Sequence, residues 1–185
     1  MDIYIKKELS HGRPTDAGSR LPKEQRCYDK LDELCIDYYV ADHDAADTIE
    51  ACHEVERVLG AEICKNLFLT NRQQTEFYLL LMHGDKPFKT KFLSRQLGTA
   101  RLSFAPPEKM EELLDITPGS VSVLGLMNDG GRVHLVIDKE LLSDEYIGFH
   151  PCINTSTLRL RTDDILNRFL PAVGHDYTVV ELETE

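Results

Sequence analysis

Hydrophobic residues recur along the 185-residue chain with two spacings, which predict two kinds of element. Apolar positions three to four residues apart are typical of helices, and we expect helices at residues 22–36, 47–60, 89–98, 106–119 and 162–170. Stretches rich in β-branched and aromatic residues predict strands, here at 36–43, twice within 64–84, and at 101–105, 120–126, 132–138, 145–150 and 156–160.

The two strands within 64–84 read as a hairpin around the polar turn Asn71–Gln74. The second strand is apolar throughout from Phe77 to Met82, so we expect it to be covered on both faces. This hairpin is therefore the predicted core of the fold.

The order of the elements predicts the fold class. Strands come in consecutive runs interrupted by helices, which favours an α+β or mixed-sheet α/β fold over strict alternation. Residues 1–21 mix Gly12, Pro14, Gly18 and charged residues without apolar periodicity, so they read as an N-terminal extension. Residues 22–185 are expected to form one domain.

Composition narrows the functional classes. With 32 acidic and 21 basic residues the net charge is -11, which disfavours nonspecific binding to nucleic acid or anionic membranes. The five cysteines are odd in number and lack CxxC spacing, and the N-terminus lacks a signal-peptide apolar segment. No apolar run approaches the about 20 residues of a membrane-spanning helix. We therefore expect a soluble cytoplasmic protein with reduced thiols.

Common catalytic signatures are missing from the sequence. It contains no GxSxG, GxxxxGK or HExxH motif and no GxGxxG after a strand. The histidines are scattered singly, which argues against a metal site. Cys152, two positions after His150, could be a thiol nucleophile, but activation also needs a base within reach and an orienting group. A small residue packed beside a strand is the favoured interpretation of Cys152.

Two groups of basic residues are candidates for binding. Lys65 lies among apolar residues at the start of a predicted central strand, where burial is costly unless something pairs with the charge. The alternative is a strand-edge lysine that reaches solvent. A second group could face a phosphate backbone or could be a solvated helix face; its members are Lys86, Lys89, Lys91 and Arg95.

The stretch GFHPCINTSTLRL, residues 148–160, is the candidate functional loop. Gly148 and Pro151 would suffice for a turn before the hydroxyl-rich strand, whereas His150 and Asn154 are not needed for one. A structural turn ahead of a strand is the alternative.

Five stretches together resemble the prolyl-tRNA editing family, the YbaK/ProX type of aminoacyl-tRNA deacylase. They are CKNLFLTN, FLSRQLGTARLSFAPPE, ITPGSVSVLGLMND, VIDKELL and GFHPCINTSTLRL, in that order between about Lys23 and Leu170. The resemblance implies a mixed central sheet or partly closed barrel flanked by short helices. It also implies a free-standing editor that hydrolyses the ester joining a wrong amino acid to the 3' adenosine of proline tRNA.

The long ITPGSVSVLGLMND stretch looks most like the alanine-specific branch, with the cysteine-specific branch as a near relative. An editor makes physical sense, because a proline pocket rejects a smaller amino acid by only about 1 to 3 kcal/mol per missing methylene. The ester is already activated, so the resemblance requires no metal, cofactor or covalent nucleophile. A non-catalytic module of the same fold that binds aminoacyl-tRNA or a synthetase is the alternative of a different class.

The resemblance also implies roles for individual residues. Lys65 and Asn66 would hold the terminal adenosine and the ester, while Gly148 and His150 would position the aminoacyl group and the water, largely through backbone groups. A side-chain base at His150 is the alternative. Substrate contacts would come from Phe149, Pro151, Asn154 and Thr155. The acceptor end of tRNA(Pro) is the implied partner, and the acidic net charge suggests help from the synthetase or an elongation factor in gripping a whole tRNA.

Overall fold

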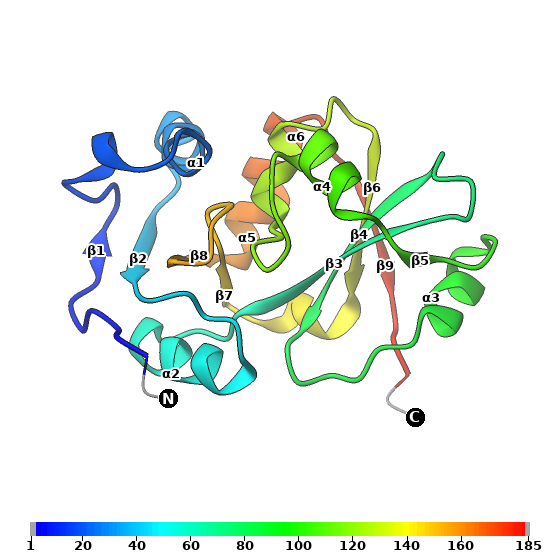
Figure 1. The fold of residues 1–185 in the computed structure, drawn as a ribbon, viewed down its shortest axis with the longest axis horizontal. Helices are drawn as coiled ribbons and strands as arrows, with labels where there is room; N and C mark the ends of the chain where they lie inside the picture. The colour runs from blue at the N-terminus through cyan, green and yellow to red at the C-terminus, as the bar shows by residue number, and fades with distance from the viewer. Residues whose placement is uncertain (1–2, 184–185) are drawn as a thin grey trace.

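Two β-sheets organise the computed structural model, which describes residues 3–183 (Figure 1). One sheet is antiparallel, and its strands in spatial order are β1 (Ser10–His11), β2 (Tyr38–Asp42), β8 (Ser156–Arg161) and β7 (Tyr146–Phe149). The other sheet is mixed, and its order is β5 (Ser103–Phe104), β3 (Cys64–Thr70), β4 (Phe77–His83), β6 (Val133–Asp138) and β9 (Tyr177–Val180).

Helices surround the sheets, and their ends follow local sequence signals. The longer helices are α1 (Pro22–Glu33), α2 (Ile49–Leu59), α3 (Thr90–Leu97) and α4 (Pro107–Leu114). Thr48 caps α2 by accepting a hydrogen bond from the Ala51 N–H, and Gly60 ends the helix in the left-handed region. After β8 the chain forms a helical run of α5 (Thr162–Asp164), a π-helical segment (Ile165–Phe169) and α6 (Leu170–Ala172).

The predicted mixed α/β class is confirmed. Antiparallel pairing joins β3 to β4, whereas β4 and β6, and β6 and β9, are parallel. Within residues 3–183 the strands form two sheets that do not close into a barrel. No helix in this described part of the chain is long and apolar enough to cross a membrane.

The β3–β4 hairpin forms the core, as predicted. Leu79, Leu80, Leu81 and Met82 on β4 are all buried, although consecutive side chains of a strand point to opposite faces. Burial on both faces explains why β4 lacks the apolar and polar alternation of a strand that has one solvated face.

Residues 120–126 were predicted as a strand, and this prediction is wrong. The segment forms a 3₁₀ helix, Val123–Met127, in which Ser122 accepts a hydrogen bond from the Leu124 N–H. The helix packs so tightly against the end of α4 that a methyl group on Gly125 would lie 3.1 Å from Leu114 Cβ. Burial on all sides gives the segment an apolar run without periodicity, which does not distinguish a strand from a helix.

The segment before α1 packs against the rest of the protein. Its strand β1 pairs with β2, Ala17 is part of the hydrophobic core, and Arg20 contacts side chains of α1, β2 and β8. The proposed boundary between an extension, residues 1–21, and the domain remains a prediction, and its first two residues lie outside the described part of the chain.

Gly148 lies where the two sheets meet. Its N–H donates to the Glu62 carbonyl at 2.8 Å, and the residue forms a parallel bridge with Ile63, just before β3. A methyl group on Gly148 would lie 3.0 Å from the Glu62 carbonyl oxygen and 3.2 Å from Ile63 Cα. Only glycine permits this approach without moving the backbone.

We expect Gly148→Ala to lower the free energy of unfolding by about 1 to 3 kcal/mol, because the added methyl group overpacks the junction. Gly18→Ala is the matched control, since a methyl group on Gly18 meets no atom within 4 Å, and its effect should stay within about 0.5 kcal/mol. Urea denaturation followed by circular dichroism measures both. Equal stabilities for the two variants would contradict the packing argument.

Candidate active site

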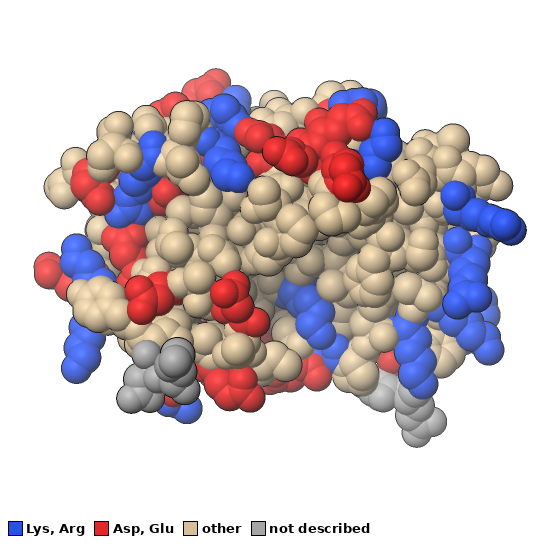
Figure 2. All heavy atoms as spheres, in the orientation of Figure 1, with Lys and Arg blue, Asp and Glu red and all other residues tan. Residues whose placement is uncertain are grey.

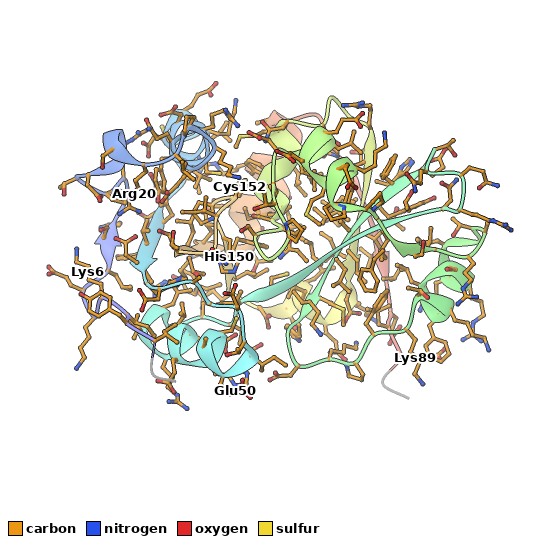
Figure 3. The ribbon with its side chains drawn as sticks, viewed as in Figure 1. Lys6, Arg20, Glu50, Lys89, His150 and Cys152 are labelled. Carbon is orange, nitrogen blue, oxygen red and sulfur yellow. The ribbon has the colours of Figure 1, made fainter. Side chains whose placement is uncertain are left out.

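A cavity of about 660 Å³ lies where the first residues of β3 face the loop that follows β7. Its wall includes Lys65 and Asn66 from β3 and His150 from the loop. Lys86, from the second basic group, also lines this wall. The structure therefore brings together four of the residues that the sequence analysis selected, from three separate stretches. Figure 3 shows His150 near the middle of the molecule.

Lys65 presents a partly satisfied ammonium group to the cavity. The side chain is half-buried, and its Nζ donates to the Lys86 carbonyl oxygen at 3.2 Å. An ammonium group has three N–H donors, so two remain for a ligand. None of the carboxylates in residues 3–183 forms an ion pair with Lys65, so the positive charge is available to a bound anion or to a developing oxyanion.

Asn66 presents an unsatisfied acceptor. Its Nδ2 donates to the Cys64 carbonyl at 2.8 Å, whereas its Oδ1 is buried without a hydrogen-bond partner in the described part of the chain. Buried polar atoms are nearly always hydrogen-bonded in native proteins. Asn66 also lines the cavity, so its unsatisfied Oδ1 belongs to a side chain at the cavity wall.

His150 belongs to a hydrogen-bonded chain that determines its tautomer. The Nδ1 atom faces the Ser156 carbonyl at 3.1 Å, and a carbonyl oxygen only accepts, so Nδ1 carries the proton. Thr157 Oγ1 lies 3.2 Å from the same nitrogen and 2.8 Å from His43 Nε2, while His43 Nδ1 donates to the Asp44 carbonyl at 2.7 Å. The Nε2 atom of His150 is left as an acceptor.

Burial keeps His43 and His150, the two histidines of this hydrogen-bonded network, neutral near pH 7. Burial lowers the pKa of His150 because the charged imidazolium loses its hydration; the hydrogen bond to Ser156 raises the pKa and the nearby His43 lowers it, and the net pKa is about 4. Burial also lowers the pKa of His43, partly offset by its hydrogen bond to Asp44. A histidine with a pKa near 4 is a weak base at neutral pH.

Three residues of the predicted loop pack against the protein interior instead of facing the cavity. Phe149 packs in the hydrophobic core, Pro151 is buried, and the Gly148 N–H is occupied by the Glu62 carbonyl. None of the three lines the cavity wall, which the loop reaches through His150.

Asn154 and Thr155 line a second hollow of about 460 Å³ on the other side of the loop. The Asn154 Nδ2 donates to Asp47 Oδ1 at 2.9 Å, and the Thr155 carbonyl accepts from the His43 N–H at 3.0 Å. Of the residues predicted to bind substrate, Asn66 thus lines the first cavity and Asn154 and Thr155 line the second, whereas Phe149 and Pro151 line neither.

Several cavity residues were not identified from the sequence. Gly119 lies in the ITPG stretch and has a φ of +88°, so the TPG sequence signalled a tight turn, although only the fold brings this turn to the cavity. Asp47 and Glu62 carried no such signal, because only the fold brings them to the cavity. Three side chains at its edge hold metal-ligating atoms within 4.8 Å of one another: Glu62, His83 and Asp144. His83 Nε2 contacts Asp144 Oδ2 directly at 2.5 Å, which is closer than two ligands of one ion lie.

The predicted cationic group separates into two parts. Lys86 is buried, and its Nζ pairs with Asp138 at 2.8 Å and Glu140 at 3.2 Å, so its charge is neutralised. Lys89, Lys91 and Arg95 are exposed at or near α3. Figure 2 shows blue side chains gathered along the right-hand edge, where Figure 1 places α3 and the β3–β4 turn.

Comparison with known proteins identifies relatives over most of the chain. A prolyl-tRNA editing protein ProX from Acetoanaerobium sticklandii is 34% identical over 154 residues, which cover 83% of this chain and 93% of that protein. A prolyl-tRNA synthetase associated domain-containing protein 1 from Mus musculus is 32% identical over 172 residues, covering 90% and 99%.

A solved structure described as a candidate trans-editing enzyme for prolyl tRNA synthetase has the same fold, with a TM-score of 0.68. It is 20% identical and covers 90% of this chain and 99% of its own. The profile of the aminoacyl-tRNA editing domain matches residues 43–167, which include Lys65, Asn66 and the loop that carries His150. The chain belongs to the aminoacyl-tRNA editing domain family.

Proposed function

We propose that the protein is a trans-editing hydrolase that deacylates mischarged Ala-tRNA(Pro) to free alanine and tRNA(Pro). The observation that carries the proposal is the convergence in one cavity of the Lys65 ammonium group, the unsatisfied Asn66 Oδ1 and the neutral His150. Family membership and relatives described as prolyl-tRNA editing proteins support the same reaction.

Hydrolysis of the aminoacyl ester develops negative charge on the carbonyl oxygen in the transition state. The free N–H donors of Lys65 stabilise this charge or hold the terminal adenosine beside it. Asn66 Oδ1 accepts a hydrogen bond from the ribose or from the substrate ammonium group. Water is the second reactant: as the ester bond breaks, its hydroxyl group is added to the alanine carbonyl carbon and its proton goes to the ribose 3' oxygen.

His150 takes part chiefly through the backbone of its loop. Its imidazole has a pKa of about 4, which makes it a weak proton acceptor at neutral pH, and its Nδ1–H is already committed to the Ser156 carbonyl. The side chain thereby braces the loop against β8, while loop carbonyl and N–H groups orient the aminoacyl group and the water. Gly148, Phe149 and Pro151 support the loop, and Asn154 and Thr155 contact the substrate from the second hollow.

Alanine is favoured over cysteine because the long ITPGSVSVLGLMND stretch resembles the alanine-specific branch. The protein then works as a second sieve for amino acids that are too small for the proline pocket to reject. Its partner is the acceptor end of tRNA(Pro), with the synthetase or an elongation factor delivering the substrate.

Lys65→Ala is expected to lose most of the deacylation rate, by roughly a hundredfold or more, because it removes a donor to the developing oxyanion. Amino acid release is measured from Ala-tRNA(Pro), Cys-tRNA(Pro) and Pro-tRNA(Pro), and Lys109→Ala on α4 is the control for loss of a lysine. Loss of alanine alone supports the proposed substrate, and preference for cysteine moves the protein to the neighbouring branch. If all three esters hydrolyse no faster than they do without protein, the enzyme proposal is rejected in favour of a non-catalytic binding module.

His150→Ala should lower the rate by no more than about tenfold, because it removes the hydrogen bond that braces the loop on Ser156 but does not remove an effective general base. In the unmodified protein the ring signals of His150 should stay unchanged between pH 8 and pH 6 and shift only near pH 4, as followed by NMR. A hundredfold loss of rate together with titration near pH 6.5 would assign the side chain as a general base.

Replacing both Lys89 and Lys91 by alanine should weaken tRNA binding and reduce the slope of log K against log salt by about two, if each contacts one phosphate. Lys6→Ala with Lys7→Ala is the matched control, since these lysines are also exposed and Lys6 lies far from Lys89 (Figure 3). Binding is measured by fluorescence anisotropy at several salt concentrations. If the two double variants have equal slopes, Lys89 and Lys91 do not contact tRNA phosphates and α3 is a solvated surface.

A further inference from the structure

Arg20, in the segment before α1, is nearly buried and makes an unusually large number of contacts. Its side chain is 12% exposed, and its guanidinium donates to three carboxylates and two hydroxyl groups. The acceptors are Asp16 Oδ1 at 2.9 Å, Glu24 Oε1 at 2.8 Å, Asp42 Oδ1 and Oδ2 at 2.8 and 2.9 Å, Tyr28 Oη at 3.2 Å and Ser156 Oγ at 3.2 Å.

The bidentate pair with Asp42 is the strongest part of this cluster, because two parallel N–H donors match one carboxylate. Burial by itself raises the pKa of Asp42, but hydrogen bonds from Arg20 and Ser156 outweigh it and lower the pKa overall. Asp42 therefore stays ionised. Asp42 is half-buried, so removing its cation leaves a charge that water compensates only in part.

Ser156 connects this cluster to the loop that carries His150. Its Oγ donates to Asp42 Oδ1 at 2.8 Å, and its carbonyl accepts the His150 Nδ1–H. Ser156 and Asp42 also form the last residue pair of the β2–β8 ladder. The end of a ladder opens more readily than its middle, and Arg20 binds both residues of this last pair.

We propose that Arg20 is a positioning residue, which holds the Asp42–Ser156 end of the ladder and thereby the loop from Gly148 to Thr155 in its working conformation. The inference rests on the proposed deacylation at this cavity. It gives the segment before α1 a part in catalysis, although this segment lies outside residues 43–167, the part matched by the family profile. Figure 3 shows Arg20 in the left part of the molecule and His150 nearer its middle.

Arg13 provides the comparison that separates positioning from stability. It lies in the same segment and binds two carboxylates of α1, Asp29 and Asp32. None of its described contacts reaches β8 or the loop. Replacing Arg13 therefore removes ion pairs to two carboxylates, against three for Arg20, but breaks no contact that connects to the His150 loop.

The test compares Arg20→Gln, Ser156→Ala and Arg13→Gln with the unmodified protein, at a temperature where circular dichroism shows each to be folded. We expect Arg20→Gln to lower kcat for alanine release by roughly tenfold or more with KM little changed, since a misplaced loop weakens the transition state more than binding. Arg13→Gln should keep kcat within about twofold. Ser156→Ala, which leaves Arg20 its three carboxylates, should also lower kcat and tests the link if Arg20→Gln does not fold.

NMR of the histidine ring nitrogens supplies a readout that is independent of catalysis. The unmodified protein should show His150 as the single Nδ1–H tautomer, whereas Arg20→Gln and Ser156→Ala should show mixed tautomers, and Arg13→Gln should match the unmodified protein. Folded Arg20→Gln and Ser156→Ala variants with unchanged kcat and a single tautomer would overturn the inference. If the unmodified protein releases no amino acid, the proposed function fails, while the NMR comparison still decides whether Arg20 holds the loop.

Discussion

The parallel bridge between Ile63 and Gly148 sets the geometry on which the site depends. Lys65 and His150 each follow their bridge residue by two positions, and residues two apart on extended chains point to the same face. The bridge therefore brings a lysine of the mixed sheet and a histidine of the antiparallel sheet to one side of the junction, where both line the cavity. Glycine is required at position 148 because the backbones approach too closely for a Cβ atom.

The two lysines that line this cavity within residues 3–183 differ in their pairing with carboxylates. Lys86 is neutralised by Asp138 and Glu140, and its carbonyl oxygen holds Lys65 Nζ. His43 and His150 are kept neutral by burial. Lys65 is consequently the lysine of the described cavity wall whose charge is free for a ligand, while the Lys86 carbonyl orients its ammonium group. The two lysines thus differ in what they face: Asp138 and Glu140 pair with Lys86, whereas none of the described carboxylates pairs with Lys65.

The spacing of hydrophobic residues predicted most of the helices and strands. It failed where a segment is buried on all sides and its hydrophobic residues have no regular spacing. The hairpin, the longer helices and most strands were expected from spacing and from stop signals such as Gly60 and Gly98. The 3₁₀ helix at Val123–Met127 was mistaken for a strand because its own residues form a continuous apolar run, which has no helical period. The strand β9 was missed because it is short and mostly exposed at the edge of its sheet.

The site was predictable where resemblance singled out a motif and unpredictable where contacts come from the fold. Lys65, Asn66 and His150 were selected and meet in one cavity. The burial of Lys86 depends on Asp138, which is 52 residues away in the chain, and no local pattern reports that pairing. The contacts of Arg20 were equally hidden, because its segment reads as polar and irregular and its partners lie on α1, β2 and β8.

The uneven distribution of charge gives the protein a permanent electric dipole. Acidic side chains dominate the net charge of -11, yet basic ones gather at the end that carries α3 (Figure 2). In the field of a polyanion such a molecule experiences a torque that turns this end forward, even while its net charge opposes approach. Its collisions are fewer than those of a basic protein but are biased in orientation, and salt weakens the repulsion and the bias together.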